Sequence, residues 1–174
     1  GFIKLNGTTV GAVANRSTLY DEEGNAVEEF NAEISARGCE KAAKFVEFCD
    51  AFNIPVLTLT NAAGFKATKC SEKKMAAAAA ALTYAFAEAT VPKVNVVVGK
   101  AYGSAYVTMN SKGLGADVVY AWPNAKIGMM GAKLAVKVMY PEADAKELRE
   151  KEAAYAELQN SVASAAKRGY VDSV

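Results

Sequence analysis

The sequence has 174 residues, 52% of them hydrophobic and 22% charged, a composition typical of a globular protein with a sizeable core. Twenty basic and nineteen acidic residues leave a net charge of +1, so electrostatics give no case for a nucleic-acid partner. No apolar run reaches the roughly 18 to 20 residues of a membrane span. The absence of histidine excludes Ser-His-Asp and Cys-His catalysis and histidine zinc sites.

The cysteines and the two ends of the chain bear on its cellular setting. Cys39, Cys49 and Cys70 are odd in number and unevenly spaced, so we predict reduced thiols in a cytoplasmic protein rather than a disulfide framework. The N-terminus has no signal-peptide pattern and no initiating methionine. Residues 169–174 begin a new apolar stretch, so we expect a single domain excised from a longer chain.

The N-terminal third predicts a strand hairpin, a surface segment and a helix. The turn Asn6-Gly7 between two strand-like runs is a strong hairpin signal. An acidic, polar segment follows, and after it apolar side chains recur with helical period until Asn53. We expect strands at 2–5 and 9–15, a surface segment at 20–31 and a helix at 40–52.

The rest of the chain alternates short apolar strands with helices. This alternation is typical of α/β folds with parallel strands, whose ligands usually bind at the carboxyl ends of the strands. Strands are expected at 56–60, 94–98, 117–122 and 126–129, and helices at 71–90, 107–114, 131–140 and 142–168. The alanine-rich helix at 71–90 is expected to pack closely against a neighbour.

The stretch from Lys100 to Tyr106 (KAYGSAY) joins a buried strand to a helix through small residues. The first N–H groups of a helix lack intrahelical partners and lie at the positive end of its dipole. Small side chains let a ligand approach those groups. The pattern therefore indicates an oxyanion hole, although a close contact between helix and strand would explain the same residues equally well.

Other small-residue motifs have weaker functional interpretations. Residues 61–65 and 131–132 each follow a strand and could line the same crevice, but tight packing is the commoner reason for such segments. Ser104 is not expected to be a nucleophile, because it lacks a Gly-x-Ser-x-Gly elbow and a histidine base. Gly113-x-Gly115 lacks the third glycine of a dinucleotide site, and the three cysteines lack a fourth metal ligand.

Several segments together resemble one family, the C-terminal half of the carboxyltransferase (beta) subunit of biotin-dependent acyl-CoA carboxylases and decarboxylases of the propionyl-CoA carboxylase type. The matching segments occur in the order of the family and cover most of the chain. They are residues 7–15, 41–55, 82–93, 100–106, 120–123 and 130–133. Residues 17–33 do not match and look like a local insertion.

The resemblance implies a crotonase-like α/β fold of ββα superhelix units over residues 1–174. It also implies carboxyl transfer between carboxybiotin and an acyl-CoA of the propionyl, acetyl or methylmalonyl type. The family's second oxyanion hole, which faces the biotin ureido group, corresponds to the backbone N–H groups of Ser104 and Ala105 beside Gly103. Substrate or biotin binding is assigned by resemblance to Val107, Ala63, Gly64, Phe65, Gly131 and Ala132, and no metal is implied.

The same resemblance implies biotin on a carrier protein or domain as cofactor and a coenzyme A thioester as substrate. The implied partners are the N-terminal carboxyltransferase half, the biotin carboxyl carrier protein, biotin carboxylase or membrane decarboxylase subunits, and further copies of the same subunit. Because the family's active site lies between the two halves, we expect this chain alone to be inactive. The open alternatives are another crotonase-like acyl-CoA enzyme, such as a hydratase or hydrolase, and a non-catalytic assembly domain.

Three differences from the family pattern fall at the implied site. Ser104 stands where the family usually has glycine, and Val107 stands where it often has aspartate, a position linked to substrate choice. Ala62-Ala63 replaces Val-Pro in the loop before Gly64. We therefore expect the preferred acyl group to depend on Val107, and the three changes together leave open a diverged relative with altered or lost activity.

Overall fold

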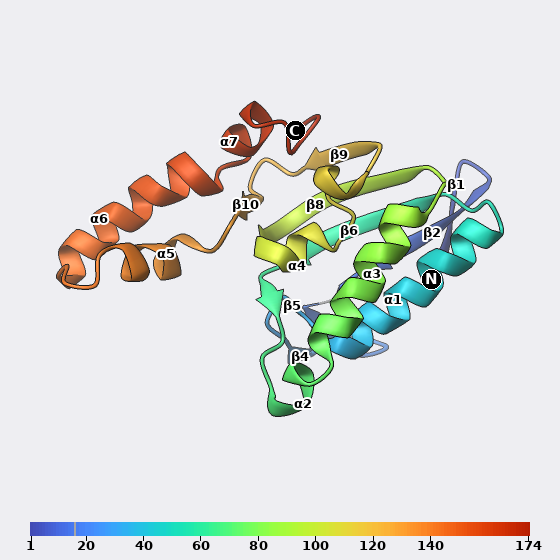
Figure 1. Ribbon diagram of the computed structural model, residues 1–174, viewed down its shortest axis with the longest axis horizontal. Helices are drawn as coiled ribbons and strands as arrows, with labels where there is room; N and C mark the ends of the chain where they lie inside the picture. Colours follow the sequence, from blue (N-terminus) through green and yellow to red (C-terminus); the bar gives the residue numbers. More distant parts are fainter. Residues whose placement is uncertain (16) are drawn as a thin grey trace.

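The computed structural model describes residues 1–15 and 17–174 and contains one main β-sheet (Figure 1). The strands lie in the order β1, β2, β6, β8 and β10, and β9 also pairs with β8. Within this sheet β1 and β2 are antiparallel, and the other described pairs are parallel. The strands are β1 (Phe2–Leu5), β2 (Thr8–Ala14), β6 (Val56–Ala62), β8 (Lys93–Tyr102), β9 (Val118–Ala121) and β10 (Lys126–Gly128). The predicted α/β class with parallel strands is confirmed.

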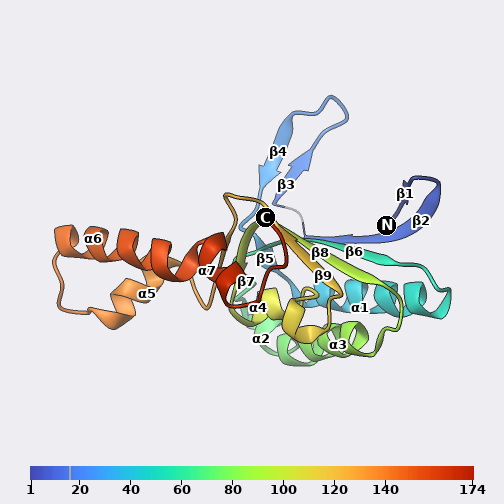
Figure 2. The ribbon, with the colours of Figure 1, turned by 90° about the horizontal axis from the view of Figure 1, so that it is seen from above.

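The predicted N-terminal hairpin is confirmed, and its turn has the expected backbone. Asn6 and Gly7 have φ angles of 50° and 83°, and positive φ at both central positions is what a type I′ hairpin turn requires. The acidic segment is exposed as predicted, but it is a hairpin of β3 (Thr18–Tyr20) and β4 (Ala26–Glu29). Figure 2 shows this ribbon projecting away from the sheet.

Helix α1 (Ala36–Ala51) begins four residues before the predicted start at residue 40. The Ser35 side chain accepts a hydrogen bond from the Gly38 N–H at 3.1 Å and so caps the helix. At the other end, Asn53 has a φ of 55° and ends the helix where the sequence predicts. The sequence Ser-Ala-Arg-Gly at residues 35–38 was too weak a local signal to place the helix start correctly, because glycine disfavours the helix interior.

The predicted helix at 71–90 is divided into α2 (Lys69–Glu72) and α3 (Met75–Glu88). The Thr68 hydroxyl accepts from the Ser71 N–H at 3.2 Å, so the first helix starts earlier than expected. The chain then turns at Lys73 and Lys74 before α3. Neither residue breaks helices by intrinsic propensity, so the position of the break was not visible in the sequence.

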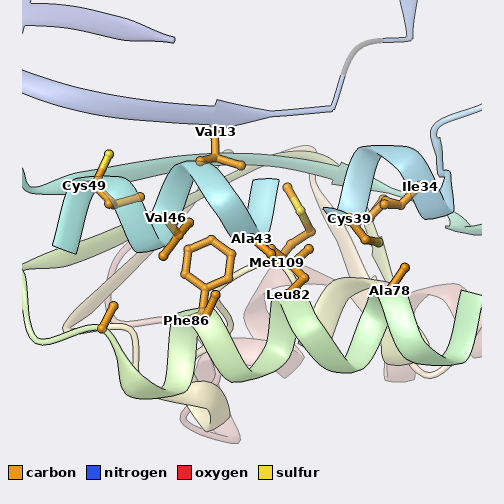
Figure 3. Close-up of a cluster of buried hydrophobic side chains, with 14 of the residues drawn as sticks. Val13, Ile34, Cys39, Ala43, Val46, Cys49, Ala78, Leu82, Phe86 and Met109 are labelled. Atoms are coloured by element: carbon orange, nitrogen blue, oxygen red, sulfur yellow. The ribbon is translucent and has the colours of Figure 1, made fainter. Parts of the chain in front are cut away.

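The core lies between the sheet and the helices α1 and α3, which pack side by side (Figures 2 and 3). Figure 3 shows Val46, Leu82 and Phe86 in this core, and all three are fully buried. Alanines on α3 let it approach α1 closely, as the sequence predicted. Buried side chains of Ala105 and Met109 join the same cluster, so the segment that follows β8 is anchored in the core.

The end of β8 and the start of the helix that follows it both differ from the prediction. Strand β8 continues beyond the predicted residue 98 to Tyr102, and helix α4 (Gly103–Val107) follows at once. The predicted helix at 107–114 is therefore wrong. Asn110, with a φ of 56°, lies between α4 and a 3-10 turn at Lys112–Leu114.

After β10, residues 132–155 form a helical arm that extends away from the sheet (Figure 1). Helix α5 (Ala132–Met139) confirms the prediction at 131–140. The predicted helix at 142–168 is interrupted, because α6 (Ala145–Tyr155) runs into a π-helical segment and Ser161 then caps a new helix. That last helix is α7 (Val162–Lys167). Within residues 1–15 and 17–174, no helix combines the length and apolar character needed to cross a bilayer.

Candidate functional site

The candidate site lies at the edge of the sheet where three neighbouring parallel strands end. Strands β2, β6 and β8 run in the same direction, so Ala14, Ala62 and Tyr102 lie toward one edge. Helix α4 begins directly after Tyr102, with no intervening loop. The strand, turn and helix predicted from the sequence are therefore present, although the turn is sharper than predicted.

Gly103 makes this sharp turn possible. Its φ of 56° lies in the left-handed region, and a Cβ atom there would come within 3.0 Å of the Met129 carbonyl oxygen. Both the backbone conformation and the close approach favour glycine over any other residue. The helix consequently starts at residue 103 rather than at the later position that its side-chain pattern suggested.

We expect Gly103→Ala to lower the free energy of unfolding by about 1–2 kcal/mol, because alanine is strained in the left-handed region. Denaturant unfolding measures this difference. Gly113→Ala is the matched control, since Gly113 has no left-handed φ and a Cβ added to it would meet no atom within 4 Å. That variant should stay within about 0.5 kcal/mol of the wild type. Equal losses in both variants would contradict this account of Gly103.

The first turn of α4 presents the two predicted backbone donors. Tyr102 precedes the helix without a side-chain cap, and the N–H groups of Ser104 and Ala105 have no acceptor among the described residues. Ser104 is exposed, whereas Ala105 is only 1% exposed. The structure thus places two adjacent N–H groups at the strand end, one on a surface residue and one on a residue of the core.

A groove of about 470 Å³ begins beside these donors and follows α4, a size that falls in the range of small-molecule sites. Its walls come from α4 and the following turn, from β10 and from the end of α7. The main lining residues are Gly103, Ser104, Val107, Ile127, Met129 and Tyr170. Three of the predicted site residues, Gly103, Ser104 and Val107, therefore meet at one groove.

Two buried hydroxyl groups in the groove wall were missed by sequence reasoning. Tyr106 and Ser111 are lining residues, and their hydroxyl oxygens are buried without a hydrogen-bond partner among the described residues. Burial raises the pKa of Tyr106 to about 12, so this phenol stays neutral at physiological pH. A buried hydroxyl without a protein partner is usually satisfied by an ordered water. Tyr106 ends the motif at residues 100–106, but no role was assigned to its hydroxyl, and nothing in the local sequence marks Ser111.

The charges near the groove are already engaged. Lys112 Nζ lies 2.9 Å from Asp172 Oδ2, and the hydrogen bond from Lys112 holds the pKa of Asp172 below its usual value. Arg168 Nη2 donates to Gln159 Oε1 at 2.7 Å. Among the described lining residues there is no aspartate, glutamate or histidine. The groove can therefore stabilise negative charge through N–H and O–H donors, but its own walls supply no ordinary general base.

The other predicted binding residues lie next to the groove rather than in its lining. Gly64 and Phe65 form β7 (Gly64–Phe65), which pairs with β5 (Glu33–Ile34) and contacts α4, and Ala63 directly precedes β7. Gly131 precedes Ala132 at the start of α5, where a Cβ on Gly131 would lie 3.5 Å from the Tyr102 ring. These two groups flank the turn between β8 and α4.

The described part of the chain holds no cluster of three metal-ligating side chains of the His, Cys, Asp or Glu type. Its three cysteines are free, and burial raises the pKa of Cys39 to about 11, so that thiol stays protonated. Cys70 is exposed and Cys49 is buried. No cysteine contributes to the groove lining.

Comparison with families and curated proteins gives consistent matches along the whole chain. The model of the carboxyl transferase domain family matches residues 1–174. The propionyl-CoA carboxylase beta chain of Saccharopolyspora erythraea is 44% identical over 185 residues, covering all of this chain and 32% of the relative. The human mitochondrial propionyl-CoA carboxylase beta chain is 43% identical over 178 residues, covering 30% of the relative. The chain thus spans about a third of the length of these relatives.

Solved structures give the same result for the fold. The transcarboxylase 12S hexamer with methylmalonyl-coenzyme A and methylmalonic acid superposes with a TM-score of 0.87 at 38% identity, covering 99% of this chain and 32% of that one. The beta subunit of P. aeruginosa geranyl-CoA carboxylase superposes with a TM-score of 0.79 at 29% identity, with the same coverage. These neighbours confirm the predicted crotonase-like α/β fold.

Proposed function

This chain belongs to the carboxyl transferase domain family, and from that premise we propose that it forms the biotin-facing half of an acyl-CoA carboxyltransferase site. The observation that carries the proposal is the turn at Gly103, after which the Ser104 and Ala105 N–H groups have no partner among the described residues. Ser104 lines the groove, whereas Ala105 lies beneath it in the core. The two N–H groups would donate hydrogen bonds to an oxygen that gains negative charge during the reaction.

The residues present fit a biotin ureido group. A ureido oxygen needs N–H donors and close access to the backbone, and the adjacent N–H groups of Ser104 and Ala105 have no partner among the described residues. When bound, biotin would carry the carboxyl group and, after its release, would accept the proton from the acyl α-carbon. That role is consistent with groove walls that carry no carboxylate or imidazole among the described residues.

The remaining residues of the site would orient the reactants and exclude water. Val107 is 45% exposed and, with Met129, presents an apolar wall along the groove. An apolar wall lowers the local dielectric constant and so strengthens hydrogen bonds to a charged oxygen. The other residues assigned by resemblance would flank the turn between β8 and α4. They are Gly64 and Phe65 in β7, and Gly131 and Ala132 at the start of α5.

The proposed substrate class is an acyl-coenzyme A thioester. Relatives and neighbours support this class, since one is a transcarboxylase with bound methylmalonyl-coenzyme A and another is a geranyl-CoA carboxylase. The proposed partners are the N-terminal carboxyltransferase half, a biotin carboxyl carrier, biotin carboxylase or decarboxylase membrane subunits, and further copies of the subunit. We place the assembled enzyme in the cytoplasm, and we expect residues 1–174 alone to be inactive.

The test is carboxyl transfer by the natural gene product that contains this chain. Decarboxylation of malonyl-, methylmalonyl- and glutaconyl-coenzyme A is followed with and without free biotin. We expect loss of CO₂ that depends on biotin and prefers one of the three acyl groups. A folded oligomer without activity toward any of them would instead favour a non-catalytic assembly role.

A further inference from the structure

Strand β8 contains a bulge just before the candidate site. Thr60 of β6 pairs with Val97 of β8, whereas Ala62 of β6 pairs with Ala101 of β8. Two steps along β6 therefore correspond to four steps along β8. Bulges leave backbone groups unpaired, change the direction of the strand and often occur beside active sites.

The Asn61 side chain fills the gap that the bulge creates. Its Oδ1 accepts a hydrogen bond at 2.9 Å from the N–H of Lys100, in the stretch where β8 is out of step with β6. Gly99 leaves room for this contact, because a Cβ on Gly99 would lie 2.6 Å from Asn61 Oδ1. Asn61 and Gly99 thus form a matched pair, one supplying the acceptor and the other the space.

Asn15, which follows the last residue of β2, holds Asn61 in place. The Asn61 N–H donates to Asn15 Oδ1 at 3.1 Å, and Asn15 Nδ2 donates to the Asn61 carbonyl oxygen. One side-chain amide therefore pairs both backbone groups of Asn61, as a neighbouring strand would. A fixed backbone at Asn61 in turn fixes where its side chain meets Lys100.

We propose that Asn15 and Asn61 form an asparagine clamp that positions the turn between β8 and α4 for catalysis. Only Ala101 and Tyr102 separate Lys100 from Gly103, so a change at the bulge passes directly to the first N–H groups of α4. The clamp joins β2, β6 and β8 at the edge of the sheet that carries the site. The proposal rests on the proposed function, and it makes both asparagines positioning residues rather than catalytic ones.

Substitutions at Asn61 and Gly99 test the clamp in the natural gene product. Asn61→Leu removes the acceptor and should lower kcat roughly 10- to 100-fold with little change in KM, because small misplacements of catalytic groups have effects of this size. Gly99→Ala should give the same loss by displacing the Asn61 side chain. Asn61→Asp keeps an oxygen acceptor for the Lys100 N–H and should restore most of kcat.

Gly11→Ala is the matched control for steric strain. Its Cβ would lie 2.5 Å from Cys49 Sγ, an overlap as severe as that at Gly99, but Gly11 pairs with Val56 at the opposite end of β6. We expect this control to lower Tm and to leave kcat unchanged. If kcat falls in Asn61→Leu, Gly99→Ala and Gly11→Ala in proportion to the fall in Tm, general destabilisation explains the loss of activity. That result would overturn the positioning role.

Amide hydrogen exchange separates failure of the clamp from failure of the proposed function. In Asn61→Leu, two hydrogen-bonded amides should exchange faster than in the wild type: that of Lys100, which donates to Asn61 Oδ1, and that of Thr108, which donates to the Ser104 carbonyl oxygen in α4. Asn61→Asp should slow both again. A wild type without carboxyl transfer would refute the proposed function, and the exchange rates would still decide on the clamp. Wild-type exchange at these amides in Asn61→Leu would overturn the clamp whether or not the enzyme is active.

Discussion

Replacing Ala105 with proline should reduce carboxyl transfer by roughly 10²- to 10³-fold, the usual effect of removing one oxyanion donor. Proline has no backbone N–H, and the first turn of a helix tolerates it because that N–H has no intrahelical acceptor. Ala105 is the third residue of α4, and its N–H has no partner among the described residues. The measurement is kcat for biotin-dependent decarboxylation by the assembled enzyme.

Two comparisons separate loss of the donor from damage to the fold. Ala145→Pro places proline at the first residue of α6, on an exposed position away from the groove, and should leave kcat unchanged. An amide-to-ester replacement at Ala105 removes the N–H without adding a ring, and it should reproduce the loss of kcat. Full activity of a folded Ala105→Pro enzyme would rule out Ala105 as a donor.

Replacing Phe86 with alanine should lower the free energy of unfolding by about 3–5 kcal/mol. Phe86 is fully buried between α1 and α3 (Figure 3), so the variant loses the transfer energy of the ring and also leaves a cavity. The backbone contact at this position, in which Lys93 Nζ donates to the Phe86 carbonyl oxygen at 2.7 Å, is retained in the variant. Denaturant unfolding followed by circular dichroism measures the loss.

Tyr84 on the same helix is the control for this prediction. It is 63% exposed, so Tyr84→Ala removes an aromatic ring of similar size without opening a cavity. We expect a change within about 0.5 kcal/mol for this surface substitution. Comparable losses for the two variants would contradict the packing of Phe86 as the source of the loss, because both substitutions introduce alanine, the strongest helix former.

Much of the architecture could be predicted because its signals are local. The Asn6-Gly7 turn, the end of α1 at Asn53 and the strands β6, β9 and β10 all follow from turn chemistry or short apolar runs. The errors occurred where the local signal was weak or misleading. The predicted helices at 71–90 and 142–168 are interrupted, and α4 occupies residues 103–107 instead of 107–114.

The candidate site also contains some residues that local sequence signals identified and others that they did not. Gly103, Ser104 and Val107 were identified from one continuous stretch, and the structure places them at one groove. The clamp of Asn15 and Asn61 was not identified, because these residues lie 46 positions apart and meet only through the pairing of β2 with β6. The hydroxyls of Tyr106 and Ser111 gained significance only from their burial.

The sequence by itself determined the family, the α/β class and the glycine turn at the strand end. These depend on residue identity and on backbone sterics within a few neighbouring residues, and Gly103 is the example. Only the tertiary structure decided where helices break, how the bulge in β8 is bridged and which polar groups lack partners. Those features depend on contacts between residues distant in the chain, whose geometry is set once the strands align and the core closes around them.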